Sequence, residues 1–247
     1  TSRTDLNIPD AQKDLLKKLV KTGKPVVLVL FAGRPLTLVW EEENVPAILD
    51  VWFPGTEAGY AVADVLFGDV NPSGKITATF PRSVGQVPIS YNYKHTGRAP
   101  LKEKPSEKYR TGYIDETYEP LYPFGYGLSY TQFEYSDLTL DKEVINSNEY
   151  LTASITITNK GTVDGKEIVQ LYLRDVVGSV TRPLKELKGY EKLFLKAGES
   201  KNVRFKITPE MLRFYNYDIE YVYEPGEFDV MIGSNSRDVL TKRFILR

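Results

Sequence analysis

The chain has 247 residues, of which 41% are hydrophobic and 26% charged, and its formal net charge is −1. This length allows one large domain or two ordinary ones. The near-neutral charge gives no electrostatic basis for binding nucleic acid or an anionic membrane, and no stretch approaches the ~20 apolar residues of a membrane span. The chain contains no cysteine, which excludes disulfides, thiolate catalysis and thiolate metal sites.

The first third of the chain alternates between helical and strand patterns. Apolar residues at helical spacing after Pro9 predict an amphipathic helix. Two continuous apolar runs, residues 26–31 and 47–53, predict strands buried on both faces, as in a parallel sheet covered by helices. A helix over 57–68 and a third, shorter strand over 75–80 complete a pattern that is typical of an α/β fold.

The last hundred residues have a different texture. Apolar and polar residues alternate in several short stretches separated by turns rich in Gly, Pro and Asp. This pattern predicts half-buried strands in an antiparallel β-sandwich of about 100 residues. Because cysteine is absent, a fibronectin-III-like sandwich fits better than an antibody domain. The alternating stretches are residues 151–159, 167–175, 202–207 and 227–233.

The α/β part has few strands for a sheet with helices on both faces. Buried strands need neighbours for their backbone hydrogen bonds, and residues 81–133 contain no buried-strand run that could supply them. The chain also opens without an initiator methionine or an apolar leader. We therefore expect a processed form or a fragment, whose sheet partners lie upstream of Thr1; a self-associated sheet edge is the alternative.

Glu57 is the best-placed acid in the α/β part, since it lies where a strand gives way to a helix. An acid in the first helical turn interacts favourably with the helix dipole and the free N–H groups, which is the simpler interpretation. The alternative is that Glu57 lines a cleft at the carboxyl end of the sheet, where open α/β folds bind ligands. A solvated helix face accounts for Asp64 and Asp69.

His95 is the only histidine, and it lies in the polar loop "NYKHTGRAP". A Ser-His-Asp triad would have to use it, but no Gly-x-Ser-x-Gly motif accompanies it. Simple surface exposure is the first interpretation, and contact with substrate is the second. No metal site is expected from one histidine without EF-hand spacing, although a Ca²⁺ in a loop stays open, and no cofactor motif is present.

Tyrosine is abundant, with 17 residues in the chain. Seven of them fall between 109 and 135, and they are Tyr109, Tyr113, Tyr118, Tyr122, Tyr126, Tyr130 and Tyr135. They either pack two domains together, with their hydroxyls reaching water or backbone, or stack on sugar rings. The first interpretation is favoured.

Four stretches, in this order, resemble glycoside hydrolase family 3, the family of β-glucosidases and β-xylosidases, and in type its periplasmic members. They are "KPVVLVLFAGRPL", "WFPGTEAGYAVADVLFGDVNPSGKITATFPRSVGQVPI", "LYPFGYGLSYTQF" and "TRPLKELKGYEKLFLKAGES". The resemblance implies the later part of an α/β sandwich domain with flavodoxin-like layers over 1–95, an extended linker over 96–133 and a fibronectin type III-like domain over 134–247. It also implies a periplasmic or secreted enzyme.

The resemblance further implies that both catalytic carboxylates lie outside this chain. The nucleophilic aspartate belongs to an N-terminal (β/α)8 barrel, and the acid/base glutamate to a loop just upstream of Thr1. We therefore expect no catalytic residue here, an inactive isolated chain, and an oligosaccharide or glucoside as substrate of the parent. His95 and Arg98, in a loop with Tyr93, Thr96 and Gly97, are candidate substrate contacts. Ser2, Arg3 and Asp5 follow the acid/base loop, and Arg3 and Asp5 would pin it rather than touch substrate.

Three roles stay open at this stage. The chain could be part of an exo-acting β-glucosidase, or of a β-xylosidase. Its sandwich and tyrosines could bind carbohydrate independently of catalysis. It could also brace the other domains or form a homodimer. No nucleic acid or membrane partner is expected.

Overall fold

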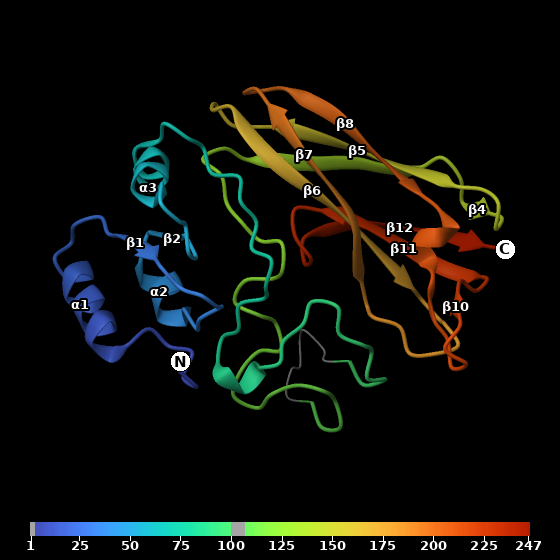
Figure 1. Ribbon diagram of the computed structural model, residues 1–247, viewed down its shortest axis with the longest axis horizontal. Helices are drawn as coiled ribbons and strands as arrows, with labels where there is room; N and C mark the ends of the chain where they lie inside the picture. Colours follow the sequence, from blue (N-terminus) through green and yellow to red (C-terminus); the bar gives the residue numbers. More distant parts are fainter. Residues whose placement is uncertain (1–2, 100–106) are drawn as a thin grey trace.

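The computed structural model describes residues 3–99 and 107–247. Figure 1 shows two parts with a long connection, residues 80–99 and 107–132, between them. In the first part, a two-stranded parallel sheet of β1 and β2 lies among three helices, in register Val27↔Ala47 to Leu30↔Asp50. The elements of this part are α1 (Asp10–Val20), β1 (Val27–Leu30), α2 (Val39–Asn44), β2 (Ala47–Asp50) and α3 (Ala58–Phe67). The two predicted helices and the first two predicted strands are confirmed. The strands are not buried on both faces as expected, because Leu30 is the one buried residue among Val27–Leu30 and Ala47–Asp50.

α1 forms where the apolar spacing predicts a helix. Asp10 lies in its first turn and Lys17 and Lys18 in its last, so the charges complement the helix dipole at both ends. Gly23 follows with φ of 71°, a left-handed conformation that glycine adopts without strain, and its N–H donates to the carbonyl of Val20 at 3.1 Å. This turn redirects the chain into β1.

The strand expected over residues 75–80 is not formed. This segment instead runs beside residues 121–126, where the N–H of Ile76 donates to the carbonyl of Tyr126 at 2.9 Å. Within the described part of the chain, the one β-bridge formed by residues 75–80 joins Phe80 and Tyr122. Residues 123–126 form a turn, in which the N–H of Tyr126 donates to the carbonyl of Pro123 at 3.1 Å and Gly125 has φ of 81°, so no extended partner continues the pairing beyond Tyr122. The hydrophobic pattern was correct about burial at Phe80, which is 2% exposed, but wrong about the strand.

The second part is the β-sandwich expected from the alternating pattern. One sheet has the order β4-β12-β11-β6-β7 and the other β3-β5-β8. The sheets contain β3 (Phe133–Leu140), β4 (Val144–Ile145), β5 (Leu151–Asn159), β6 (Gly165–Asp175), β7 (Glu186–Leu195), β8 (Ser200–Ile207), β11 (Gly226–Gly233) and β12 (Val239–Leu246). A small hairpin of β9 (Phe214–Tyr215) and β10 (Tyr221–Val222) projects from this part, and two 3-10 turns cover Val84–Gln86 and Pro209–Leu212.

The core of the sandwich lies between its two sheets. Along β5 every second residue is buried, from Leu151 to Asn159, as the alternation predicts. β6 departs from this rule, because Gln170 and Tyr172 on its other face are only 3% and 0% exposed. Tyr91 and Gly125 cover that face: the Tyr91 ring packs edge-on against Tyr172 with centroids 5.9 Å apart, and the Gly125 carbonyl accepts a hydrogen bond from Gln170. The sandwich therefore has a second buried face, toward the connection.

The connection contacts both parts. On one side Phe80 and Leu121 share a core with Leu30 and Leu38 of the α/β part. On the other, Lys94 bridges to Pro183 of the sandwich. The domain boundaries at residues 95 and 133 stay a prediction. Within residues 3–99 and 107–247, no helix combines the length and apolar character needed to cross a membrane.

Candidate functional site

The loop that carries His95 and Arg98 is held by a second segment of the chain. The carbonyl of Arg98 accepts the N–H of Thr111 at 2.9 Å, and the hydroxyls of Thr96 and Thr111 lie 2.8 Å apart. His95 Nδ1 accepts the N–H of Gly97 at 2.8 Å, and Nε2 has no hydrogen-bond partner among the described residues. Both candidate side chains are exposed. The loop is thus a pre-shaped surface that presents an imidazole and a guanidinium to solvent.

A cavity of ≈ 320 Å³ adjoins this loop at Tyr93. Burial raises the pKa of Tyr93 and of Tyr118, so both phenols stay neutral hydrogen-bonding groups at physiological pH. From the sandwich, Lys185 donates to the carbonyl of Ser236, and burial lowers its pKa. Aromatic rings make up much of the wall, from Tyr91, Tyr93, Tyr113, Tyr118 and Phe124.

The tyrosines of the connection largely pack within the protein. Tyr122 and Tyr126 stack with ring centroids 5.1 Å apart, and Tyr113 stacks with Tyr118 at 6.3 Å. The Tyr130 hydroxyl donates to the backbone carbonyl of Val65 at 2.6 Å. This agrees with the packing interpretation for these rings, while Tyr109 is 73% exposed.

Arg3 and Asp5 fix the first described residues against the α/β part. Asp5 Oδ1 accepts the backbone N–H and the side-chain amide of Asn7 at 2.9 and 2.8 Å, and these bonds lower the Asp5 pKa. Arg34 donates to the backbone carbonyls of Arg3 and Asp5. The segment is thereby held beside the end of β1. Ser2 lies outside the described residues.

The carboxyl end of β2 carries Asp50, a residue that the sequence did not single out. Its Oδ1 accepts the N–H of Trp52 at 3.4 Å, while its buried Oδ2 has no hydrogen-bond partner among the described residues. Burial raises the Asp50 pKa. Trp52 has φ of 50°, a strained conformation for a bulky residue, and its ring packs edge-on against Phe80.

Glu57 takes the N-cap position of α3. Its side chain is exposed and makes no capping hydrogen bond, and its backbone carbonyl accepts the N–H of Ala61 at 3.0 Å. The backbone therefore starts the helix without help from the carboxylate. This arrangement gives Glu57 no acid-base partner among the described residues.

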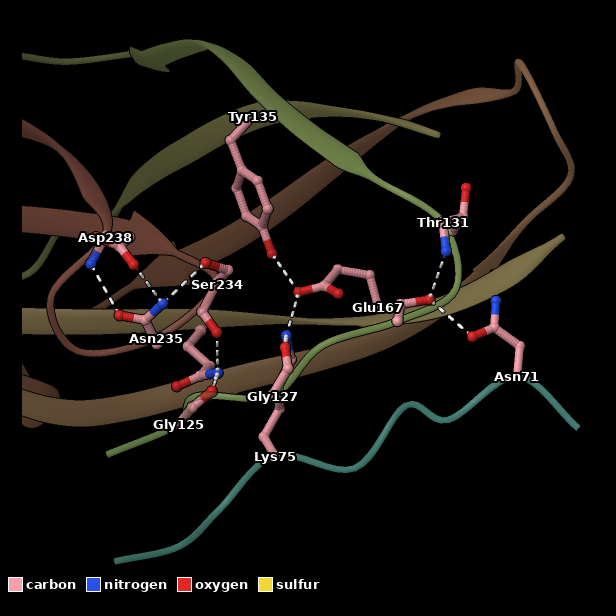
Figure 2. A network of polar contacts seen from close by, with 12 residues as sticks. Asn71, Lys75, Gly125, Gly127, Thr131, Tyr135, Glu167, Ser234, Asn235 and Asp238 are labelled. Atoms are coloured by element: carbon pink, nitrogen blue, oxygen red, sulfur yellow. Dashed lines mark hydrogen bonds and ion pairs between the residues drawn. The ribbon is translucent and has the colours of Figure 1, made fainter. Parts of the chain in front are cut away.

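A cluster of polar side chains joins the α/β part to the sandwich (Figure 2). Lys75 Nζ lies 3.0 Å from Glu167 Oε1 and also donates to the Gly127 carbonyl at 3.0 Å. The Tyr135 hydroxyl donates to the same Glu167 oxygen at 2.8 Å. Glu167 is 3% exposed, so this charge depends on its two partners. Burial, and then the Glu167 charge, raise the Tyr135 pKa far above its usual range.

Asn71 adds to the same cluster, because its side chain binds the segment after Gly127 and the turn before β6. Its Oδ1 accepts the Ser129 hydroxyl at 2.8 Å and the N–H of Tyr130 at 2.9 Å. Figure 2 shows Asn71 facing the segment that leads into Thr131. Its amide donates to the Asp164 carbonyl at 2.9 Å, in the turn before β6. One side chain thus joins three segments of the chain.

Two glycines allow these segments to approach. A Cβ at Gly127 would overlap the backbone carbonyl of Gly74, and a Cβ at Gly125 would overlap the Gln170 side chain. Gln170 donates to the carbonyls of Gly125 and Ser234 at 3.0 and 2.7 Å. The motifs "NPSGK" and "FGYGLSY", about fifty residues apart, therefore form a single structural unit.

Two sequence families account for most of the chain. The model described as Glycosyl hydrolase family 3 C-terminal domain matches residues 1–130, and the model described as Fibronectin type III-like domain matches residues 167–236. The chain belongs to glycoside hydrolase family 3. The predicted family and the predicted fold class are both confirmed.

Relatives within family 3 match nearly the whole chain. A "Periplasmic beta-glucosidase" of Salmonella typhimurium is 52% identical over 246 residues, which are 100% of this chain and 32% of that protein. A "Beta-xylosidase" of Formosa agariphila is 46% identical, over 95% of this chain and 31% of its own. The crystal structure of a beta-glucosidase from Listeria innocua in complex with glucose has a TM-score of 0.93 and 45% identity, and covers 98% of this chain and 33% of that one. The chain thus spans about a third of the length of these family 3 relatives.

The family 3 assignment does not by itself place a catalytic group here. The structure brings His95 and Arg98 together in one exposed loop, and Arg3 and Asp5 in one fixed segment, but it places Glu57 apart from both as a helix cap. These site residues stay predictions. Among residues 3–99 and 107–247, no group of three or more His, Asp or Glu side chains could hold a metal ion.

Proposed function

We propose that the chain is the C-terminal part of a retaining family 3 β-glucosidase, which hydrolyses terminal β-D-glucosyl residues of oligosaccharides or glucosides. The observation that carries this proposal is its similarity to beta-glucosidases over its full length, at 52% and 42% identity for the relatives from Salmonella typhimurium and Acetivibrio thermocellus. β-Xylosides are the alternative substrate, because relatives named beta-xylosidase are also 45–46% identical.

A retaining glycosidase needs two carboxyl groups ~5–5.5 Å apart, one as nucleophile and one as acid/base. We infer that both belong to the missing two thirds of the protein: the aspartate to an N-terminal barrel domain, and the glutamate to the segment preceding Thr1. One carboxylate alone cannot form and then hydrolyse a glycosyl-enzyme intermediate. The isolated chain is accordingly inactive, and its partner is that missing part.

In the whole protein, the loop around His95 and Arg98 would contact the sugar. The guanidinium of Arg98 makes no hydrogen bond or ion pair with the residues the structure describes, so its donors are available for sugar hydroxyls or ring oxygens. The bonds from Thr96 and from the Arg98 carbonyl to Thr111 support this loop in place. Arg3 and Asp5 would position the acid/base segment through Arg34.

The sandwich domain would act as a brace for the α/β part. Support comes from the buried Lys75–Glu167 pair, which a freely hinged domain would not keep out of water. Two alternatives to this bracing role remain: the sandwich could bind carbohydrate, or it could form a homodimer. Light scattering tests for the homodimer. A periplasmic or secreted location is supported by the name of the Salmonella relative.

The test uses the longer protein that contains this chain. It should hydrolyse aryl β-D-glucosides faster than β-D-xylosides, with NMR showing β-glucose as the first product. Arg98→Ala should raise KM with a smaller change in kcat, because a sugar contact formed before the transition state is lost. Arg204→Ala, an exposed arginine on β8, is the matched control and should change neither constant. An inverted product, or no activity on either glycoside, contradicts the proposal.

A further inference from the structure

A short hairpin of the sandwich part exposes several tyrosine rings. β9 and β10 pair antiparallel, with Tyr215 opposite Tyr221. The exposed fractions are 63% for Tyr215, 89% for Tyr217 and 50% for Tyr221. We refer to residues 214–222 as the tyrosine hairpin. Folding of the described chain leaves these three rings uncovered, and clustered exposed aromatic surface of this kind marks binding sites.

The turn of the tyrosine hairpin is held by Asn216. Its side-chain Oδ1 accepts the N–H of Asp218 at 3.0 Å and of Glu220 at 2.9 Å. The N–H of Asn216 donates to the carbonyl of Glu220 at 3.0 Å, and Ile219 closes the turn with φ of 63°. Because the turn is already ordered, a ligand that binds the rings loses little free energy in ordering them.

The base of the hairpin is anchored in the sandwich. Phe214 is 3% exposed, and the guanidinium of Arg182 lies 4.3 Å from its ring centroid. Arg213 donates to the carbonyl of Tyr221 at 2.8 Å. The rings of Tyr215 and Tyr221 lie with centroids 5.0 Å apart and planes inclined by 39°. Because Tyr215 and Tyr221 lie directly opposite each other in the pairing, both rings are on the same face of the hairpin.

The charge around the rings selects the kind of ligand. Asp218 and Glu220 are both exposed at the turn. The guanidinium of Arg213 lies 5.8 Å from the Tyr221 centroid, but its charge is paired with Glu210 at 2.7 Å. They would repel a polyanion such as nucleic acid or a polyuronic acid, but they accept hydrogen bonds from neutral hydroxyls. A pyranose ring has an apolar C–H face bordered by hydroxyls, so it complements an aromatic surface flanked by acceptors.

We propose that the tyrosine hairpin binds a chain of neutral β-linked sugars, with pyranose faces stacked on Tyr215, Tyr217 and Tyr221. The β-linked ligand class rests on the proposed function, whereas the binding itself requires no hydrolysis. Such a surface would hold the protein on a polysaccharide while chain ends are processed.

Affinity electrophoresis of the 247-residue chain in gels containing mixed-linkage β-glucan tests this proposal. Wild-type protein should be retarded by the glucan and not by polygalacturonate. Tyr217→Ala and Tyr215→Ala should each raise the apparent Kd roughly five- to tenfold, as expected for loss of one aromatic contact. Tyr217→Phe keeps the ring and should stay within about twofold of wild type. Tyr190→Ala is the control, since Tyr190 is 69% exposed on β7, outside the hairpin.

The proposal is overturned if the glucan does not retard the wild-type chain. It is also overturned if Tyr190→Ala weakens glucan binding as much as Tyr217→Ala and Tyr215→Ala do. Light scattering on the same variants tests whether a second copy of the chain, rather than a glucan, binds the hairpin. If the wild-type chain is a dimer, and Tyr217→Ala makes it a monomer without changing the retardation, the hairpin joins two copies and the proposal is wrong. Retardation can fail while the longer protein stays active, which would leave the proposed function intact. Activity can likewise fail while retardation persists, which would contradict only the proposed function.

Discussion

Lys75 and Glu167 form an ion pair of 3.0 Å between two parts of the chain that are 92 residues apart, with side-chain exposures of 10% and 4%. Lys75 lies in "NPSGK", within the residues that match the family 3 C-terminal domain, and Glu167 lies near the start of β6, where the fibronectin type III-like match begins. Because both charges are buried, neither can turn to water if the other is removed. The pair therefore fixes how the sandwich sits on the α/β part.

Lys75→Met should destabilise the chain by about 3–5 kcal/mol, because Glu167 is left buried with the Tyr135 hydroxyl as its remaining partner. The double variant Lys75→Met/Glu167→Gln removes both charges and should regain much of that loss. Urea unfolding measures both effects. Lys160→Met is the control, since its pair with Glu134 is more than half exposed, at 56% and 54%, and should cost less than about 1 kcal/mol. Equal losses for Lys75→Met and Lys160→Met would contradict the account.

Gly127→Ala should destabilise the chain by about 1–3 kcal/mol, because the new Cβ overlaps the Gly74 carbonyl where the two family motifs meet. The control is Gly59→Ala in α3, where a Cβ meets no atom within 4 Å. That change should stabilise by about 0.5–1 kcal/mol, because alanine favours the helix. Denaturant unfolding should show changes of opposite sign in the free energy of unfolding for the two variants. A stabilising Gly127→Ala would show that Gly127 does not lie close to the Gly74 carbonyl.

Asp50 should make stability depend on pH. Burial raises its pKa in the folded state, so its contribution to stability is full below the unfolded value of about 3.9 and is lost as the pH rises through the folded value. Asp50→Asn removes that loss and should therefore raise Tm at pH 7 by a few degrees, as about 1 kcal/mol shifts Tm by ~2–4 °C in a chain of this size. Differential scanning calorimetry should show the gain shrinking toward pH 4. A gain that is constant with pH, or a lower Tm at pH 7, would refute this role for the carboxylate.

Local sequence patterns predicted most helices and strands. They failed where burial or pairing depends on residues that are far away in the sequence. β5 follows its alternation residue by residue, because one face meets the core and the other meets solvent. Gln170 and Tyr172 carry no such signal, since they are buried by a segment from elsewhere in the chain. The strand expected over 75–80 failed for a similar reason: residues 123–126, far away in sequence, form a turn where its partner strand would have to continue.

The residues of the candidate site also fall into two groups, those that the sequence indicated and those whose role appears only in the structure. The glycines and Asn71 lie inside stretches that carried the resemblance, but their physical purpose appears only where the two stretches meet. The carboxylate of Asp50 gave no signal, because a single acid at the end of a strand is common. Glu57 attracted attention by position, yet its exposed side chain takes no part in capping α3. His95 and Arg98 share a loop, and their role remains a prediction.

The most direct test of the central claim is to assay the isolated 247-residue chain on an aryl β-D-glucoside, beside the longer protein that contains it. The account predicts no turnover above the uncatalysed rate for the isolated chain, since two catalytic carboxylates are needed and both are placed outside it, and clear turnover for the longer protein. Turnover by the isolated chain that is abolished by replacing a carboxylate within residues 1–247 would contradict the account.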